Sequence, residues 1–135
     1  MQDYVLCGKE RTMCGESKCC NGGPRLIFAC SGAADVGEIA DRTARALTKN
    51  GLGKMFCLAG VGGRVPGIIK KTGEASDILA LDGCDLDCTK KCLEQAGFTQ
   101  FKHLRITDLG MEKGKTLATE QNVAKVVAQM DSIVT

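Results

Sequence analysis

The sequence predicts an α/β fold in three layers (α/β/α), with helices on both faces of a four-stranded parallel sheet. From residue 25 onward, short apolar runs alternate with amphipathic stretches, which is typical of repeated strand and helix units. Three of these runs are nearly continuous, as in strands buried on both faces, and the fourth alternates, as in an edge strand. Right-handed crossovers then favour the strand order 2-1-3-4, with strands 1 and 3 central.

The first strand and helix are the clearest of these units. The run "RLIFACSG", residues 25–32, is apolar almost throughout and ends in glycine, so it indicates a buried strand. Apolar residues then recur at helical spacing, with Asp35 as the expected N-cap and Glu38 completing a capping box. Asn50 and Gly51 are expected to end this helix.

The middle of the chain repeats the pattern twice. "KMFCLAG", residues 54–60, predicts the second strand, and a glycine-rich turn and a short helix from Pro66 to about Gly73 follow it. "SDILALDG", residues 76–83, predicts the third strand.

The last third of the chain supplies two more helices and the edge strand. A helix is expected over residues 84–95 with Gly97 as its stop, and the alternating run 101–107 predicts the edge strand. The final helix is expected over residues 119–133, with one apolar stripe formed by Val123, Val126, Val127, Met130 and Val134.

Composition excludes several classes of function. The chain has 135 residues, the size of one domain, and its 18 basic and 16 acidic residues leave a net charge of +2. No basic run is present, so nucleic-acid binding is not expected. No apolar stretch of about 18 residues predicts a membrane span, and the start of the sequence lacks the pattern of a secretion signal. We therefore expect a cytoplasmic protein.

Residues 1–24 differ from the rest of the chain. They show little apolar periodicity and end in a Gly-Gly-Pro boundary, and they contain four cysteines, which are Cys7, Cys14, Cys19 and Cys20. We interpret them as a cysteine-rich N-terminal arm ahead of a single domain over residues 25–135. The adjacent Cys19 and Cys20 disfavour a separate complete metal site in the arm.

The cysteines carry the most specific chemical signal. There are nine, an odd number, and no secretion signal accompanies them, so metal or redox chemistry explains them better than a disulfide framework. In the predicted sheet, ligands bind beyond the carboxyl ends of strands 1 and 3, where the connections diverge. Cys30 ends strand 1 and Cys84 ends strand 3.

Three cysteines recur every four residues within the helix expected over 84–95. Cys84 and Cys88 can converge on one metal ion, and the positive end of the helix dipole favours their thiolate form. Cys92 lies a turn deeper and is interpreted as a small buried residue. A tetrahedral soft site needs four ligands, for which Cys30 is the natural third.

Cys57 in the second strand is the weaker fourth ligand. If strands 1 and 2 start together, Cys57 lies opposite Phe28, roughly 6.6 Å below Cys30 at about 3.3 Å per residue. A shift of register would bring it up. The residues alone are therefore compatible with two alternatives. One is a closed site of four thiolates, and the other is an open site formed by Cys30, Cys84 and Cys88.

The stretches "CSGAADVGEIADRTARAL", "KMFCLAGVG" and "ALDGCDLDCTKKCLEQAGF" resemble the DGC-domain family, named after an Asp-Gly-Cys motif. The resemblance runs from Arg25 to the C-terminus. It implies zinc bound by four cysteines, which here would be Cys30, Cys57, Cys84 and Cys88.

Other interpretations use the same cysteines. A thiol-based redox enzyme could use Cys30 and Cys84, whereas a cysteine phosphatase would need an arginine where Val36 stands. An iron–sulfur cluster also suits four thiolates, although the ferredoxin type of cysteine spacing is absent. His103 is expected on the edge strand, away from the crevice, as a satisfied or solvent-facing histidine. Helix capping explains Asp85 and the helix dipole explains Asp87, so Asp82 is the one nearby aspartate for which a function is expected.

Overall fold

A computed structural model of the chain describes residues 23–134. The predicted arm therefore lies outside the described residues, except for Gly23 and Pro24 at its end. Gly23 packs so closely on the next segment that a Cβ atom there would lie 1.9 Å from the carbonyl oxygen of Glu74. The carbonyl of Pro24 accepts a hydrogen bond from the backbone N–H of Ser76. These contacts fix the entry of the chain into the domain.

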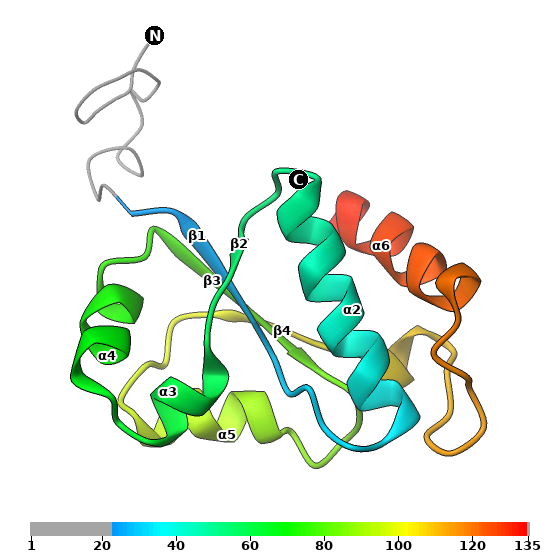
Figure 1. Ribbon diagram of the computed structural model, residues 1–135, viewed down its shortest axis with the longest axis horizontal. Coiled ribbons are helices and arrows are strands. Elements are labelled where there is room, and N and C mark those ends of the chain that lie inside the picture. Colours follow the sequence, from blue (N-terminus) through cyan, green and yellow to red (C-terminus); the bar gives the residue numbers. More distant parts are fainter. Residues whose placement is uncertain (1–22, 135) are drawn as a thin grey trace, which may run out of the picture.

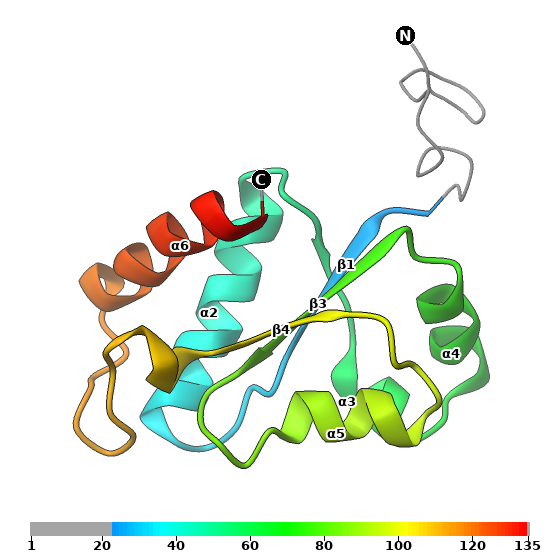
Figure 2. The ribbon, with the colours of Figure 1, turned by 180° about the vertical axis from the view of Figure 1, so that it is seen from behind.

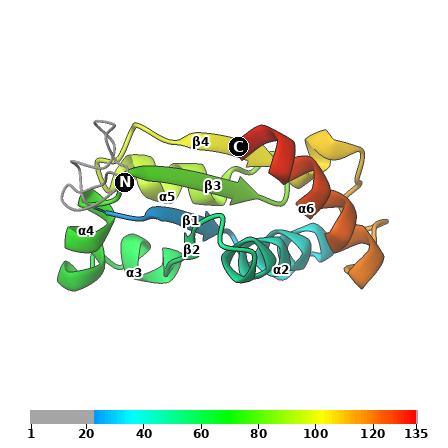
Figure 3. The same cartoon turned by 90° about the horizontal axis from the view of Figure 1, so that it is seen from above.

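The four strands form one parallel sheet in the predicted order, β2-β1-β3-β4 (Figures 1 and 3). The central strands are nearly fully buried, as their continuous apolar runs predict. The bounds are β1 Arg25–Ala29, β2 Lys54–Met55, β3 Asp77–Asp82 and β4 Lys102–Arg105.

Helices α2 (Asp35–Lys49) and α6 (Glu120–Val134) cover one face of the sheet (Figure 2). The inward residues of β1 and β3 on this face pack against the apolar stripes of both helices. Helix α2 ends as expected, with Asn50 at the C-cap and Gly51 in the left-handed region at φ 81°.

Helices α3 (Leu58–Gly62), α4 (Pro66–Gly73) and α5 (Cys88–Gln95) cover the other face. Phe28 of β1 is fully buried in this core, and its ring packs edge to face against that of Phe56 with the ring centroids 6.1 Å apart. The three-layer α/β/α architecture is thus confirmed. A short 3₁₀ turn, η1 (Ile106–Leu109), follows β4 and leads into the loop before α6.

Three local predictions were wrong. Helix α2 begins after Ala34, so Asp35 is its first residue and the expected capping box does not form. Strand β2 is only two residues long, because the chain turns into α3 where a longer strand and a glycine turn were expected. Helix α5 begins at Cys88 rather than at residue 84, because Asp87 adopts a left-handed conformation at φ 56° that no α-helix can include.

Over the described part of the chain, none of the helices combines the length and the apolar composition that a membrane span requires.

Candidate metal centre

Cys30 lies immediately beyond β1, at the carboxyl end of the sheet. Its backbone N–H donates to the carbonyl of Leu81, and its Sγ accepts a hydrogen bond of 3.4 Å from the N–H of Gly83. Burial raises the pKa of the Cys30 thiol, and the N–H groups of Gly32 and Gly83 act against that rise. Cys30 is thus held by the turn that follows the neighbouring strand.

The Asp-Gly-Cys stretch forms that turn, and its first two residues have separate physical roles. The buried carboxylate of Asp82 accepts hydrogen bonds from the N–H groups of Thr89 at 2.7 Å and Lys90 at 3.2 Å, which caps α5 from outside the helix. A Cβ atom on Gly83 would lie 2.8 Å from the backbone of Val36 and Gly37, so only glycine lets the turn approach α2 this closely.

Three of the four predicted ligands line one cavity of about 420 Å³ in this region. They are Cys30 after β1, Cys84 in the turn after β3, and Cys88 at the first position of α5. Cys30 and Cys84 are partly buried, whereas Cys88 is exposed. We call this space the thiol cavity.

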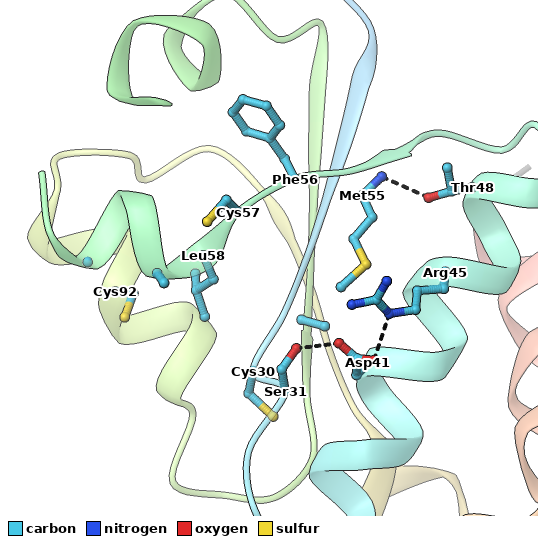
Figure 4. A pocket seen from close by; sticks show the side chains of 13 residues that line it. Cys30, Ser31, Asp41, Arg45, Thr48, Met55, Phe56, Cys57, Leu58 and Cys92 are labelled. Atoms are coloured by element: carbon cyan, nitrogen blue, oxygen red, sulfur yellow. Dashed lines mark hydrogen bonds and ion pairs between the residues drawn. The ribbon is translucent and has the colours of Figure 1, made fainter. Parts of the chain in front are cut away.

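Cys57 lies outside the thiol cavity. It is the N-cap of α3, where its Sγ accepts a hydrogen bond of 3.3 Å from the N–H of Gly60. It lines a neighbouring, wider cavity of about 970 Å³ together with Cys30 and Cys92 (Figure 4). In that view the side chains of Cys30 and Cys57 point in different directions.

The register of β2 nevertheless moves Cys57 towards Cys30. Leu26 pairs with Lys54, which is a shift of one residue from strands that start together. Continued along the strand, this register sets Cys57 beside Ala29, one residue before Cys30 rather than two. Cys92, interpreted from the sequence as a small buried residue, is partly buried and lines the wider cavity.

Within residues 23–134, one group of three or more metal-ligating side chains has all its ligand atoms within 4.8 Å of one another, and it contains no cysteine. It consists of Asp82, Asp87 and His103. By distance these residues could hold a metal ion. The five described thiols, in contrast, stand around their cavities as free cysteines.

Hydrogen-bond donors of the protein already bond to the carboxylate oxygens of Asp82 and Asp87. Nε2 of His103 lies 2.8 Å from Oδ2 of Asp82, and Arg105 donates two hydrogen bonds of 2.7 Å to the two oxygens of Asp87. The Arg105 guanidinium holds the pKa of Asp87 below its ordinary value. A cation placed here would have to displace these donors, so we interpret the group as a charged hydrogen-bond network.

His103 lies on the predicted edge strand and is a satisfied histidine, which is one of the two alternatives expected for it. It was expected away from the crevice, but it contacts Asp82, which lines the thiol cavity. The register explains this contact. His103 pairs with Ala80, so its side chain lies on the same sheet face as that of Asp82, two residues further along β3. An Asp at the end of one strand and a His on its neighbour are the only sequence signal, and it depends on knowing the register.

The donor chemistry of the thiol cavity fits a soft divalent metal. Thiolate sulfur suits zinc or iron, and a tetrahedral site takes three or four such ligands. Cys30, Cys84 and Cys88 would hold the ion once their sulfur atoms draw closer, since no three of the described thiols lie within 4.8 Å of one another. Cys57 lines the adjoining cavity. A bound zinc ion would crosslink β1, β3 and α5 through Cys30, Cys84 and Cys88. It would also supply a fixed positive charge at the site.

Comparisons with known proteins agree with the family resemblance that the Asp-Gly-Cys stretch indicates. The model of the DGC domain matches residues 26–130 of this chain. The chain is also similar to the anaerobic and virulence modulator AnvM of Pseudomonas aeruginosa, with 40% identity over 88 residues. That alignment covers 65% of this chain and 67% of AnvM. No solved structure matches the chain.

Proposed function

This chain belongs to the DGC domain family, and on that premise we propose that it binds one metal ion through cysteine thiolates at the carboxyl end of its sheet. Zinc is the ion we propose, and Cys30, Cys57, Cys84 and Cys88 are its ligands. The cytoplasm, which keeps thiols reduced, is the compartment in which such a site stays available.

The observation that carries the proposal is the thiol cavity. Residues 30, 84 and 88 come from three different segments of the chain, yet their side chains line one space of about 420 Å³. The Asp-Gly-Cys turn supports this convergence, because Gly83 donates to the Cys30 sulfur and Asp82 fixes the first turn of α5, where Cys88 lies. Thiols that served only to fill a core would have no reason to share an accessible cavity.

Cys57 would join the site by leaving its N-cap position. The bond that holds it is a weak one, from an N–H group to a sulfur atom at 3.3 Å, and it caps a helix of only five residues. Cys30 lines both cavities and so stands between Cys57 and the other two ligands. Movement of this cap would convert an open site of three thiolates into a closed site of four.

A closed site leaves zinc no open position for substrate, so its binding energy serves folding or signalling rather than catalysis. The name of AnvM describes that relative as a modulator. We propose accordingly that this chain has a binding or sensing role in which metal occupancy changes the arrangement of β1, α3 and α5.

Elemental analysis of the purified protein tests the proposal. The protein is purified under reducing, chelator-free conditions, and we expect about one zinc ion per chain. Iron accompanied by visible absorption would favour an iron–sulfur cluster on the same cysteines. The absence of any metal would contradict the proposal and would favour thiol-based redox chemistry, in which the separate free thiols exchange with a disulfide partner.

A further inference from the structure

The loop after η1 reaches back over the thiol cavity. Gly110 and Gly114 take left-handed conformations at φ 86° and 85°, which allow the chain to reverse twice in a short distance. Between them, Met111 is 8% exposed and belongs to the core cluster beneath α2 and α6. The loop is therefore anchored to the domain at its base.

Hydrogen bonds also fix the outer part of this loop. The N–H of Gly114 donates to Oδ1 of Asp35 at 2.9 Å, which ties the loop to the first turn of α2. Within the loop, Glu112 receives backbone bonds from Lys115 and Thr116, and its own N–H donates to the Thr116 hydroxyl at 2.9 Å. These bonds give the residue between Glu112 and Gly114 a defined position.

That residue is Lys113, and its ammonium group points at the thiol cavity. Its Nζ lies 3.6 Å from Sγ of Cys84, and its side chain lines the same cavity as Cys30 and Cys88. Two other charged residues line this cavity, Asp82 and Asp87, and both carboxylates are engaged by His103, Arg105 and the N–H groups of α5. Lys113 is thus the cationic side chain that faces the thiols.

A thiolate metal centre carries excess negative charge. A divalent ion with three thiolates has one net negative charge, and with four thiolates it has two. We propose that Lys113 is a charge-compensating residue of the thiol cavity, which makes the cavity attract anionic groups and strengthens its hold on a thiolate metal centre. The metal part of this inference rests on the proposed function, whereas the electrostatic part does not.

Alkylation of the reduced, metal-free protein tests the electrostatic part. The rates of Cys84 with anionic iodoacetate and neutral iodoacetamide are read by peptide mass spectrometry at one pH and low salt. Both reagents attack the same thiolate, so the ratio of the two rates cancels the fraction ionised and reports local charge. We expect Lys113→Gln, which keeps most of the side-chain stem, to lower the iodoacetate-to-iodoacetamide ratio about threefold at low ionic strength.

Matched variants separate this effect from a general change in charge. Lys115→Gln removes the same charge from the same loop, but Lys115 pairs with Glu112 at 3.4 Å and does not line the cavity, so its ratio should fall much less than that of Lys113→Gln. Lys113→Arg should retain the wild-type ratio. A ratio that is unchanged in Lys113→Gln, or lowered equally in Lys115→Gln, would overturn the inference.

The affinity for zinc, measured by competition with a chromophoric chelator, tests the part of the inference that concerns the metal centre. We expect Lys113→Gln to weaken zinc binding roughly tenfold, as the loss of a group that supports metal ligands does. Lys113→Arg and Lys115→Gln should stay close to the wild type. If the wild-type protein binds no zinc, the proposed function fails, and the alkylation ratio alone decides the role of Lys113.

Discussion

The Nε2 atom of His103 lies 2.8 Å from Oδ2 of Asp82, and this contact joins the edge strand to the end of β3. The same carboxylate accepts hydrogen bonds from the first turn of α5, and its side chain is 1% exposed. The aspartate of the Asp-Gly-Cys stretch is therefore a bridge between β3, β4 and α5. It positions the cysteines that follow it without needing to ligate a metal.

Replacing this carboxylate should destabilise the protein substantially. Asp82→Asn keeps the shape of the side chain but removes the negative charge of the carboxylate, which is bonded to two backbone N–H groups and to His103. Because hydrogen bonds to a charged group contribute about 1.5–3 kcal/mol each, we expect the free energy of unfolding to fall by about 2–4 kcal/mol. Urea titration followed by circular dichroism measures this change.

Asp85→Asn is the matched control for this experiment. Asp85 lies in the same turn but is exposed, so its replacement should change the free energy of unfolding by no more than about 0.5 kcal/mol. Equal stability of the two variants would show that Asp82 does not have the bridging role assigned to it.

Replacing the glycine of the same stretch should destabilise the protein for a steric reason. A Cβ atom on Gly83 would lie 2.8 Å from the N atom of Gly37 and the carbonyl carbon of Val36, both backbone atoms of α2. We expect Gly83→Ala to lower the free energy of unfolding by about 1–3 kcal/mol, because α2 or the turn must shift. Gly32→Ala is the control, since its Cβ would meet nothing within 4 Å. Similar losses in both variants, measured by urea titration, would contradict the steric explanation.

The strand order and most helices could be predicted because they depend on local patterns. The continuous apolar runs of β1 and β3 indicate burial on both faces, and the right-handed crossover rule converts that burial into the order 2-1-3-4. The end of α2 followed from Asn50 and Gly51, and the start of α4 from Pro66. The signals for the helix ends lie within a few residues of the features that they predict, whereas the strand order also needs the general crossover rule.

The start of α5 and the details of the site depend instead on residues far apart in the sequence. Asp87 holds its left-handed conformation beside Arg105 of β4, which donates to both of its oxygens, and the N-terminal N–H groups of α5 are capped by Asp82 of β3. The sequence shows these residues but not the pairing of β3 with β4. For the same reason, the shift of one residue between β1 and β2 was not predictable, and it changes the position of Cys57.

The contact between Asp35 and Gly114 should make stability depend on pH in the acid range. The backbone N–H of Gly114, as the main cause, holds the pKa of Asp35 below its ordinary value of 3.8. A carboxyl whose pKa is lowered by folding contributes stability that is fully present above its unfolded pKa. That contribution is lost as the pH falls through the lowered, folded value.

Asp35→Asn isolates this contribution, because the amide oxygen still accepts a hydrogen bond but carries no charge. We expect the wild type to be the more stable protein above about pH 4 and the difference to disappear as the pH falls below that. The measurement is the free energy of unfolding of both proteins from pH 2 to 6. A difference that stays constant over this range would exclude the ionised carboxylate as its source.

The cysteine ligands can be separated by single replacements with serine. Cys84→Ser should lose zinc and, with it, the stabilisation that bound zinc gives, which is about 2.7 kcal/mol when free zinc is 100 times the wild-type Kd. Cys92→Ser is the control, because Cys92 lies on the same helix as Cys88 but faces the wider cavity. It should keep both the metal and the stability of the wild type.

Cys57→Ser decides whether the site is closed or open. With zinc bound by four thiolates, Cys57 must leave its bond to the N–H of Gly60 and turn towards Cys30, and the serine variant should lose zinc as Cys84→Ser does. If Cys57 instead keeps its bond to the N–H of Gly60, three thiolates hold the ion and leave one position for water or a substrate. Full zinc content and normal stability in Cys57→Ser would therefore overturn the four-ligand proposal. The thiol cavity would then be an open thiolate site, in which Lys113 faces whatever occupies the fourth position.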